Sequence, residues 1–198
     1  MARTLSRSSA VEVWPAFTDA MLAFVLVLVL MLAYEVGSQI EIAGPSQAAV
    51  VADQRRVEAL VDSLGFAGVR VETGLGRQDI TLGQEVLFAS AGTDLEPEGT
   101  RILAALAAAV TGEGVPTLRE IQVSGHTDDE PTATATNWEL SSARATNVVR
   151  YLAEAGIDPA TVRLSGTGYG EFAPVAPNAT LAGRAANRRI EMRLLYAQ

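Results

Sequence analysis

The 198-residue sequence predicts an α/β fold, an α+β sandwich with a mixed sheet, preceded by a single N-terminal transmembrane helix. Two observations lead to this prediction. An uncharged apolar run lies near the N-terminus, and strand-like and helix-like patterns alternate from about residue 79 onward. Hydrophobic residues make up 48% of the chain and charged residues 19%, which excludes a disordered polymer.

The membrane span is predicted over residues 13–34. An uncharged run of 15 residues ends at Tyr34, but as a helix it covers only ~22 Å of a hydrocarbon layer that is ~30 Å thick. A helix that starts near Val13 is ~33 Å long. It places Trp14 and Tyr34 at the two interfaces, where aromatic residues gather. The span therefore contains Asp19.

The charges that flank the span predict its orientation. Arg3 and Arg7 precede it, and Glu35 and Glu41 follow it. Because positive charge stays on the cytoplasmic side, residues 1–12 are expected to form a cytoplasmic tail and the residues after Tyr34 to lie outside the cytoplasm.

Two alternatives remain open for this region. A basic start followed by an apolar stretch also fits a cleaved signal peptide, although Glu12 and Asp19 suit its early part poorly and no clean cleavage site follows. Asp19 could also lie at the headgroups, where the helix dipole favours an acid. The length of the span instead places Asp19 inside the helix, and acids within a membrane span are candidate functional sites.

Residues 35–78 are predicted to be a linker with a short helix. Gly, Ser and Pro open the segment, and a helix is expected from Gln47 to Leu64. Val50, Val57 and Leu64 recur every seven residues, which allows a parallel coiled coil. Fewer than three heptads are present, so a single amphipathic helix packed on the following domain is the favoured interpretation.

Residues 79–198 are predicted to form the folded domain, with elements in βαβαββ-like order. Thr136 and Glu139 form a capping box that fixes the start of the second helix. The expected strands are 79–82 (possibly continuing toward Phe88), 118–124, 162–167 and 189–195, and the expected helices are 97–110 and 137–155.

Polar residues gather around the start of that second helix. Asp128 and Asp129 follow the end of a strand, Gly125 permits a tight exit, and Arg144 lies two turns into the helix. An aspartate and an arginine that face one loop can hold a zwitterion, because the acid accepts from an ammonium and the arginine grips a carboxylate. A buried Asp–Arg pair that serves only the fold is equally compatible with the sequence.

Composition argues against several other function classes. The chain has no cysteine and one histidine, so thiolate chemistry and multi-histidine metal sites are excluded. Its net charge is −8 and it contains no lysine, which argues against nucleic acid as a partner. His126 is therefore expected to support the fold rather than catalyse a reaction, and Arg184, Arg188 and Arg189 to form a structural and surface cluster. No catalytic site, metal or cofactor is expected.

Three motif blocks, in order, resemble the OmpA-like peptidoglycan-binding domain. They are Gly125-His-Thr-Asp-Asp-x-Pro131, Asn137-Trp-Glu-Leu-Ser-x-x-Arg-Ala145, and Gly166-x-Gly-x-Gly-Glu171 with Asn187-Arg-Arg-Ile-Glu191. The resemblance implies non-covalent binding of the diaminopimelate residue of the wall peptide. By position, Asp128 would meet its ammonium and Arg144 its carboxylate, while Asn137, Thr127 and Leu140 would frame the pocket.

The stretch from Trp14 to Phe24 resembles the membrane helix of the B subunits of ion-driven motors, the MotB and TolR types. The resemblance implies that Asp19 carries the translocated proton. A lone carboxylate favours H⁺ over Na⁺, since a metal ion needs several oxygen ligands. Leu22 stands where the family often has a threonine, which leaves an auxiliary hydroxyl without a counterpart.

Together the two resemblances imply a stator, in which a proton-driven span is tethered to the cell wall. They imply a single-pass inner-membrane protein with a periplasmic domain, a homodimer, and a multi-span MotA/ZorA-like A subunit in about five copies. The compact layout favours a non-flagellar motor such as the ZorB subunit of the Zorya antiphage defence system. The alternatives are a flagellar MotB-type stator and a passive OmpA-like tether between membrane and wall.

Overall fold

The computed structural model describes residues 13–42, 45–65, 68–89, 92–111, 114–131 and 135–197. The predicted cytoplasmic tail, with Arg3 and Arg7, lies outside the described residues. The chain divides into two compact units between Gly44 and Pro45, and each is described by itself.

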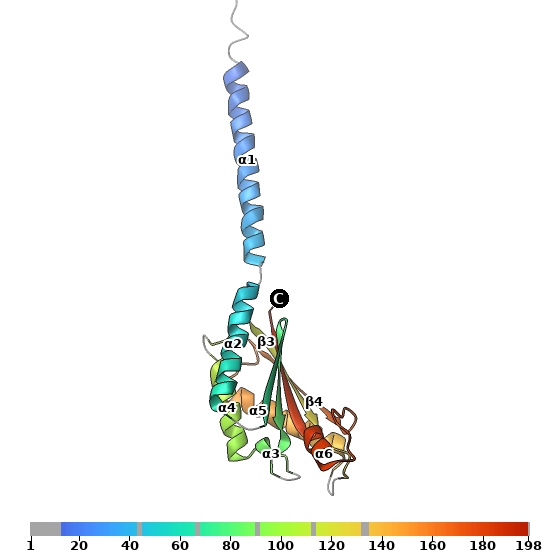
Figure 1. Cartoon of the computed structure of the whole chain (residues 1–198). Helices are drawn as coiled ribbons and strands as arrows, with labels where there is room; N and C mark the ends of the chain where they lie inside the picture. Colours follow the sequence, from blue (N-terminus) through green and yellow to red (C-terminus); the bar gives the residue numbers. More distant parts are fainter. Residues whose placement is uncertain are drawn as a thin grey trace, which may run out of the picture. The chain divides into compact units, whose positions relative to one another are not determined.

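The first unit contains helix α1, Val13–Ile42 (Figure 1). It begins at the predicted residue but runs on past Tyr34. The segment Phe17–Glu35 has a mean hydropathy of 2.3 and is long and apolar enough to cross a membrane. Its side chains are exposed, which suits contact with lipid. Asp19 lies beyond the first helical turn, which contains no acid.

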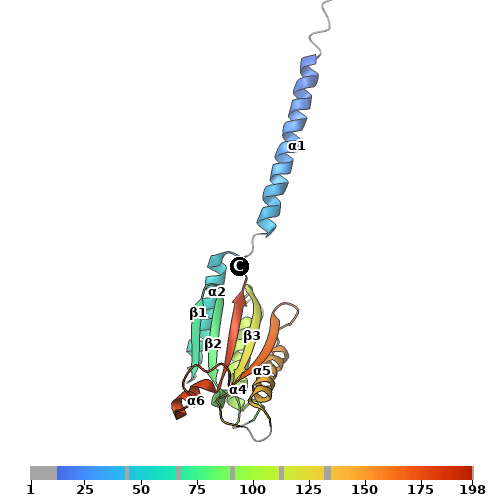
Figure 2. The same cartoon turned by 90° about the vertical axis from the view of Figure 1, so that its right-hand side faces the viewer.

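The second unit is built on a five-stranded sheet in the order β1-β2-β5-β3-β4 (Figure 2). β3 and β4 run parallel, and the other neighbouring strands are antiparallel, which confirms the predicted mixed sheet. The strands are β1 (Val69–Gly74), β2 (Arg77–Gly83), β3 (Leu118–His126), β4 (Arg163–Gly170) and β5 (Arg189–Tyr196).

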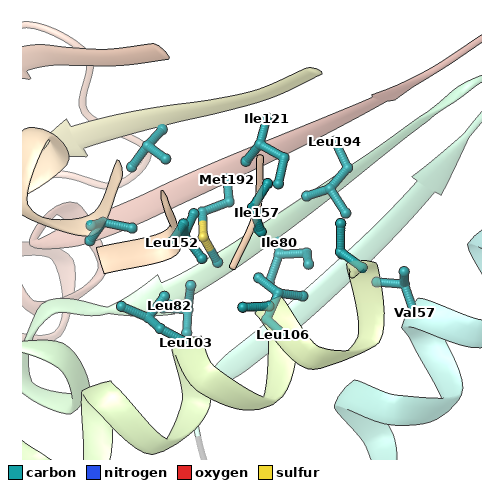
Figure 3. Close-up of a cluster of buried hydrophobic side chains, with 14 of the residues drawn as sticks. Val57, Ile80, Leu82, Leu103, Leu106, Ile121, Leu152, Ile157, Met192 and Leu194 are labelled. Carbon is teal, nitrogen blue, oxygen red and sulfur yellow. The ribbon is translucent and has the colours of Figure 1, made fainter. Parts of the chain in front are cut away.

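Helices α2 (Gln47–Leu64), α4 (Pro97–Val110) and α5 (Asn137–Glu154) cover one face of this sheet and close the core. The short helices α3 (Gln84–Leu87) and α6 (Leu181–Asn187) respectively follow β2 and precede β5 in the chain. Figure 3 shows Leu106 of α4, Leu152 of α5 and Val57 of α2 gathered against Ile80 and Met192 of the strands. Alternate strand residues point to the opposite face, which is polar.

Most predicted elements are found where local signals placed them. Pro97 opens α4, and the capping box of Thr136 and Glu139 is present at the start of α5. Strand 79–82 does not continue toward Phe88, because the chain turns into α3 instead. The sequence patterns did not predict β1, α3 or α6.

The folded unit begins at Pro45 instead of residue 79, because α2 and β1 belong to it. Val50 and Val57 are buried in the domain core, so they are not available as a coiled-coil seam. The alternative of a helix packed on the domain is therefore confirmed.

Buried polar contacts also attach α2 to the sheet. The carboxylate of Asp53 accepts hydrogen bonds from the backbone N and Oγ1 of Thr117 at 3.0 and 2.6 Å. Gln54 donates to the carbonyls of Gly74 and Arg77 in the β1–β2 turn, and Gln78 donates to the carbonyl of Gln54. These contacts hold the N-terminal half of α2 at the end of the sheet where β3 begins.

Candidate functional site

The site lies at the opposite end of β3, where the strand leads into residues 127–131. Gly125 packs directly on α5: a Cβ there would lie 2.2 Å from the carbonyl oxygen of Ser141. Ser141 in turn accepts a hydrogen bond from the backbone N of Gly170 through its Oγ, at 2.9 Å. This close packing brings the first turns of α5 beside the loop that carries Asp128.

Arg144 is almost completely buried, with 2% of its surface exposed. Its Nε donates to the carbonyl of Gly92 at 2.8 Å and its Nη1 to Oε1 of Gln84 at 2.5 Å. The guanidinium also lies 5.5 Å from the centre of the Phe88 ring. Nη2 has no hydrogen-bond partner among the described residues. Arg144 is thus fixed in place with one donor group still available.

The charge of Arg144 persists despite its burial. Burial lowers its pKa to about 10, with a smaller lowering from the positive charge of Arg188 and an opposing effect from Asp128. The group therefore stays protonated at neutral pH. A charged, buried guanidinium with a free donor is suited to bind a carboxylate.

Asp128 is also buried, but its ion pair is with Arg188. Its Oδ2 lies 2.8 Å from Nη1 of Arg188, which is about one-third exposed. Within the described chain no ion pair joins Asp128 directly to Arg144, so the fold-only pair that the sequence left open is not formed. The sequence predicts Arg188 in a structural and surface cluster but does not predict its pairing with Asp128, although Arg188 belongs to the Asn187–Glu191 motif.

The other predicted site residues gather around Asp128. Asn137 donates through Nδ2 to the carbonyl of Asp128 at 3.2 Å and to Oε2 of Glu171 at 2.5 Å. Thr127 and Leu140 are also buried. Oγ1 of Thr127 and Oδ1 of Asn137 are buried and lack a partner in the described part of the chain. Buried polar groups are normally paired, so these two acceptors are candidates for contact with a polar ligand.

Two exposed aromatic rings lie next to this cluster. Trp138 and Phe172 follow Asn137 and Glu171 in the chain, and their ring centres are 5.3 Å apart. About half of Trp138 and two-thirds of Phe172 are exposed.

His126 is poorly suited to act as a general base. Burial, followed by the charge of Arg189, lowers its pKa to about 4 against an opposing effect of Glu191. The imidazole is therefore neutral at neutral pH, and it stacks on Tyr169 with ring centres 5.1 Å apart. The described residues contain no group of three or more metal-ligating side chains.

Comparison with known proteins identifies the family. Residues 87–188 match the OmpA family. The Motility protein B of Bacillus subtilis is 45% identical over 80 residues, which is 39% of this chain and 30% of that protein. The match thus covers under one-third of that relative's length.

Two solved structures resemble most of the chain. A MotB-like protein from Desulfovibrio vulgaris gives a TM-score of 0.64 at 31% identity, over 77% of this chain and 96% of that one. The cell wall anchor of the T6SS from Pseudomonas aeruginosa gives 0.60 at 30% identity, over 78% and 99%. The chain therefore belongs to the OmpA family, as a MotB-like member that carries an apolar N-terminal helix.

Proposed function

We propose that this chain is the peptidoglycan-anchored B subunit of a proton-driven membrane motor. The observation that supports it best is the buried cluster around Asp128 and Arg144, in which donors and acceptors lie without partners in the described chain. The apolar helix α1, with Asp19 inside it, supplies the second half of the proposal. The likeness to a cell wall anchor and to Motility protein B agrees with both halves.

The wall ligand proposed for the site is the free end of a diaminopimelate residue, which carries an ammonium and a carboxylate on one carbon. The carboxylate would accept from Nη2 of Arg144, and the ammonium would donate to Asp128. Oδ1 of Asn137 and Oγ1 of Thr127 could accept the remaining ammonium hydrogens. Arg188 already pairs with Asp128, so it would share that carboxylate with the ligand and hold it in position.

The position of the site within the domain suits an anchor. The α2 contacts to Thr117 lie just before β3, and Asp128 follows the other end of this nine-residue strand. At ~3.3 Å per residue, the strand separates the two by ~30 Å. The domain is therefore attached to the preceding segment at one end and would bind the wall at the other.

Asp19 is proposed to carry the translocated proton. Its position beyond the first turn of α1 disfavours a simple capping role, since dipole effects fall off within that turn. Protonation would remove a charge from a low-dielectric contact with the A subunit, and so allow a relative step. A charge crossing 100 mV supplies ~2.3 kcal/mol, several times the thermal energy.

The proposed assembly is a homodimer of this chain within about five copies of a multi-span MotA/ZorA-like A subunit. It would lie in the bacterial inner membrane, with the N-terminus in the cytoplasm and the OmpA-like domain in the periplasm. We propose that the motor is a non-flagellar one of the Zorya type. The segment between the end of α1 at Ile42 and the start of the folded unit at Pro45 is short, which fits the compact layout of that type. No catalytic step and no cofactor other than the translocated H⁺ is proposed.

One pair of variants tests the wall-binding half. Asp128→Asn should reduce co-sedimentation of the full chain with purified sacculi, because the amide cannot neutralise an ammonium. The neighbouring Asp129→Asn is the matched control, since Asp129 is exposed. Equal sedimentation of both variants with the unaltered chain would overturn the proposed site.

A second pair tests the motor half. Asp19→Asn should preserve membrane insertion and co-purification with the A subunit while it abolishes motor output. Glu35→Gln, an acid at the end of the apolar segment, is the control and should retain output. Retained output in Asp19→Asn, or the absence of any co-purifying multi-span protein, would favour a passive tether between membrane and wall.

A further inference from the structure

A pocket lies on the polar face of the sheet, opposite to α2, α4 and α5. Its volume is about 410 Å³, within the range of small-molecule sites. Asp79, Ser124, His126, Tyr169, Glu191 and Arg193 line it, together with residues 173–175 of the segment after β4. None of the lining residues belongs to the cluster around Asp128 and Arg144.

His126 is the unusual member of this lining. It is 4% exposed, and neither ring nitrogen has a hydrogen-bond partner among the residues that the structure describes. The nearest carboxylate oxygen, on Glu191, lies 3.7 Å from Nε2. A neutral imidazole has one N–H donor and one acceptor nitrogen. A ligand with several donors and acceptors, such as hydroxyl groups and a secondary amide, would offer a separate partner for each ring nitrogen.

The charges of the pocket are already balanced. Arg193 lies 2.6 Å from Asp79, and Arg189 lies 2.6 Å from Glu191. A strongly charged ligand would therefore gain no uncompensated partner here. The lining instead offers several donors and acceptors around a neutral interior.

Tyr169 adds a flat apolar surface to these polar groups. Its ring is parallel to that of His126 within 4°, and 43% of the residue is exposed. A flat ring beside mixed donors and acceptors matches the chemistry of a pyranose, which has C–H bonds on one face and hydroxyl groups at its rim.

We propose that this pocket binds an N-acetylhexosamine ring of the glycan strand whose stem peptide occupies the Asp128–Arg144 site. This inference rests on the proposed wall-binding function and extends it from the peptide to the sugar. His126 is two residues from Asp128 at the same end of β3, and Arg189 follows Arg188. Three extended peptide residues reach ~10 Å, enough to join two neighbouring subsites.

The experiment uses the full chain in detergent micelles and three probes. These are the peptide-free disaccharide of N-acetylglucosamine and N-acetylmuramic acid, the diaminopimelate-ending tripeptide, and the muropeptide that joins the two. His126 is the only histidine of the chain, so its imidazole ¹⁵N signals report on the pocket without ambiguity. Calorimetry gives the affinities.

The disaccharide should shift the His126 signals, and the muropeptide should bind about tenfold more tightly than the tripeptide, as one or two added hydrogen bonds would give. Tyr169→Leu should remove this gain and leave tripeptide affinity unchanged. Arg163→Ala, an exposed position on the same strand, should change neither value.

The outcomes separate the two proposals. Tripeptide binding with unmoved His126 signals and no gain for the muropeptide would overturn the sugar pocket and leave the peptide site standing. Shifted His126 signals without tripeptide binding would support the sugar pocket and refute the peptide site. A gain that Tyr169→Leu retains would also overturn the pocket.

Discussion

Replacing Asp53 by Asn tests the finding that α2 is part of the folded domain. Asp53 is 3% exposed and accepts two hydrogen bonds from Thr117, at 3.0 and 2.6 Å. A hydrogen bond to a charged group contributes ~1.5–3 kcal/mol. Both bonds end on the same oxygen, Oδ2, so the amide oxygen of Asn can accept both, but as a neutral group it loses the charge-assisted part of each bond, ~1 kcal/mol per bond. The ion pair with Arg56 at 3.5 Å adds little, because Arg56 is mostly exposed.

The expected loss of stability is therefore ~2–3 kcal/mol. For a domain of this size that lowers the melting temperature by ~4–12 °C. Thermal melts of the full chain in detergent, followed by circular dichroism, would measure it. The matched control is Asp62→Asn, an exposed acid on the same helix, which should change stability by less than ~0.5 kcal/mol.

A double-mutant cycle with Thr117→Val sharpens the test. Because both side chains belong to one contact, the two losses should be less than additive, with an interaction energy of ~1 kcal/mol or more. Equal melting temperatures for Asp53→Asn and Asp62→Asn would refute the argument. They would mean that α2 contributes to the domain through its apolar face alone.

Three further predictions concern the site end of the domain. Burial lowers the pKa of His126 in the folded chain to about 4, whereas the unfolded chain has the ordinary value of ~6.5. Stability should therefore be full above pH 6.5 and fall by up to ~3 kcal/mol as the pH drops to 4. His126→Gln should flatten that part of the pH profile of stability, measured by urea denaturation. Gly125→Ala would force a Cβ to within 2.2 Å of the Ser141 carbonyl and should cost more than ~2 kcal/mol, whereas Gly166→Ala, whose nearest atoms lie at 3.4 Å, should melt close to the unaltered chain. Arg144→Lys keeps the charge but not the fork of donors, so calorimetry should show wall-tripeptide affinity lower by ~10–100-fold; unchanged affinity would exclude a guanidinium–carboxylate contact.

The three long helices of the domain, α2, α4 and α5, were its most predictable elements because their end signals are local. Ser46 caps α2 and Gly65 ends it in a left-handed conformation, and Pro97 begins α4. Each signal acts within one turn of the chain, so the sequence alone locates it. The capping box that starts α5 works in the same way.

The missed elements depend on distant partners. β1 is a short edge strand whose exposed residues give a weak alternating pattern, and it is defined by its pairing with β2. Placing residues 35–78 in a linker was wrong for the same reason: the seven-residue spacing of Val50 and Val57 fits a coiled coil and a packed helix alike. The residues that these valines contact in the folded chain determine which of the two structures forms.

The same distinction applies to the candidate site. The motifs identified Asp128, Arg144, Asn137, Thr127 and Leu140, and the structure brings all five to one end of β3. Local sequence did not indicate that Arg188, 60 residues away, takes the Asp128 carboxylate, or that Gln84 holds Arg144.

The sequence by itself determined the apolar helix with Asp19, the helix ends and the residue types of the site, because these depend on composition and on contacts within one turn. Only the tertiary structure decided that α2 and β1 belong to the domain, which charges pair, and that His126 and Tyr169 line a pocket on the polar face of the sheet. Those outcomes depend on which elements pack together. Burial and pairing between residues far apart in the chain appear only once the sheet order is fixed.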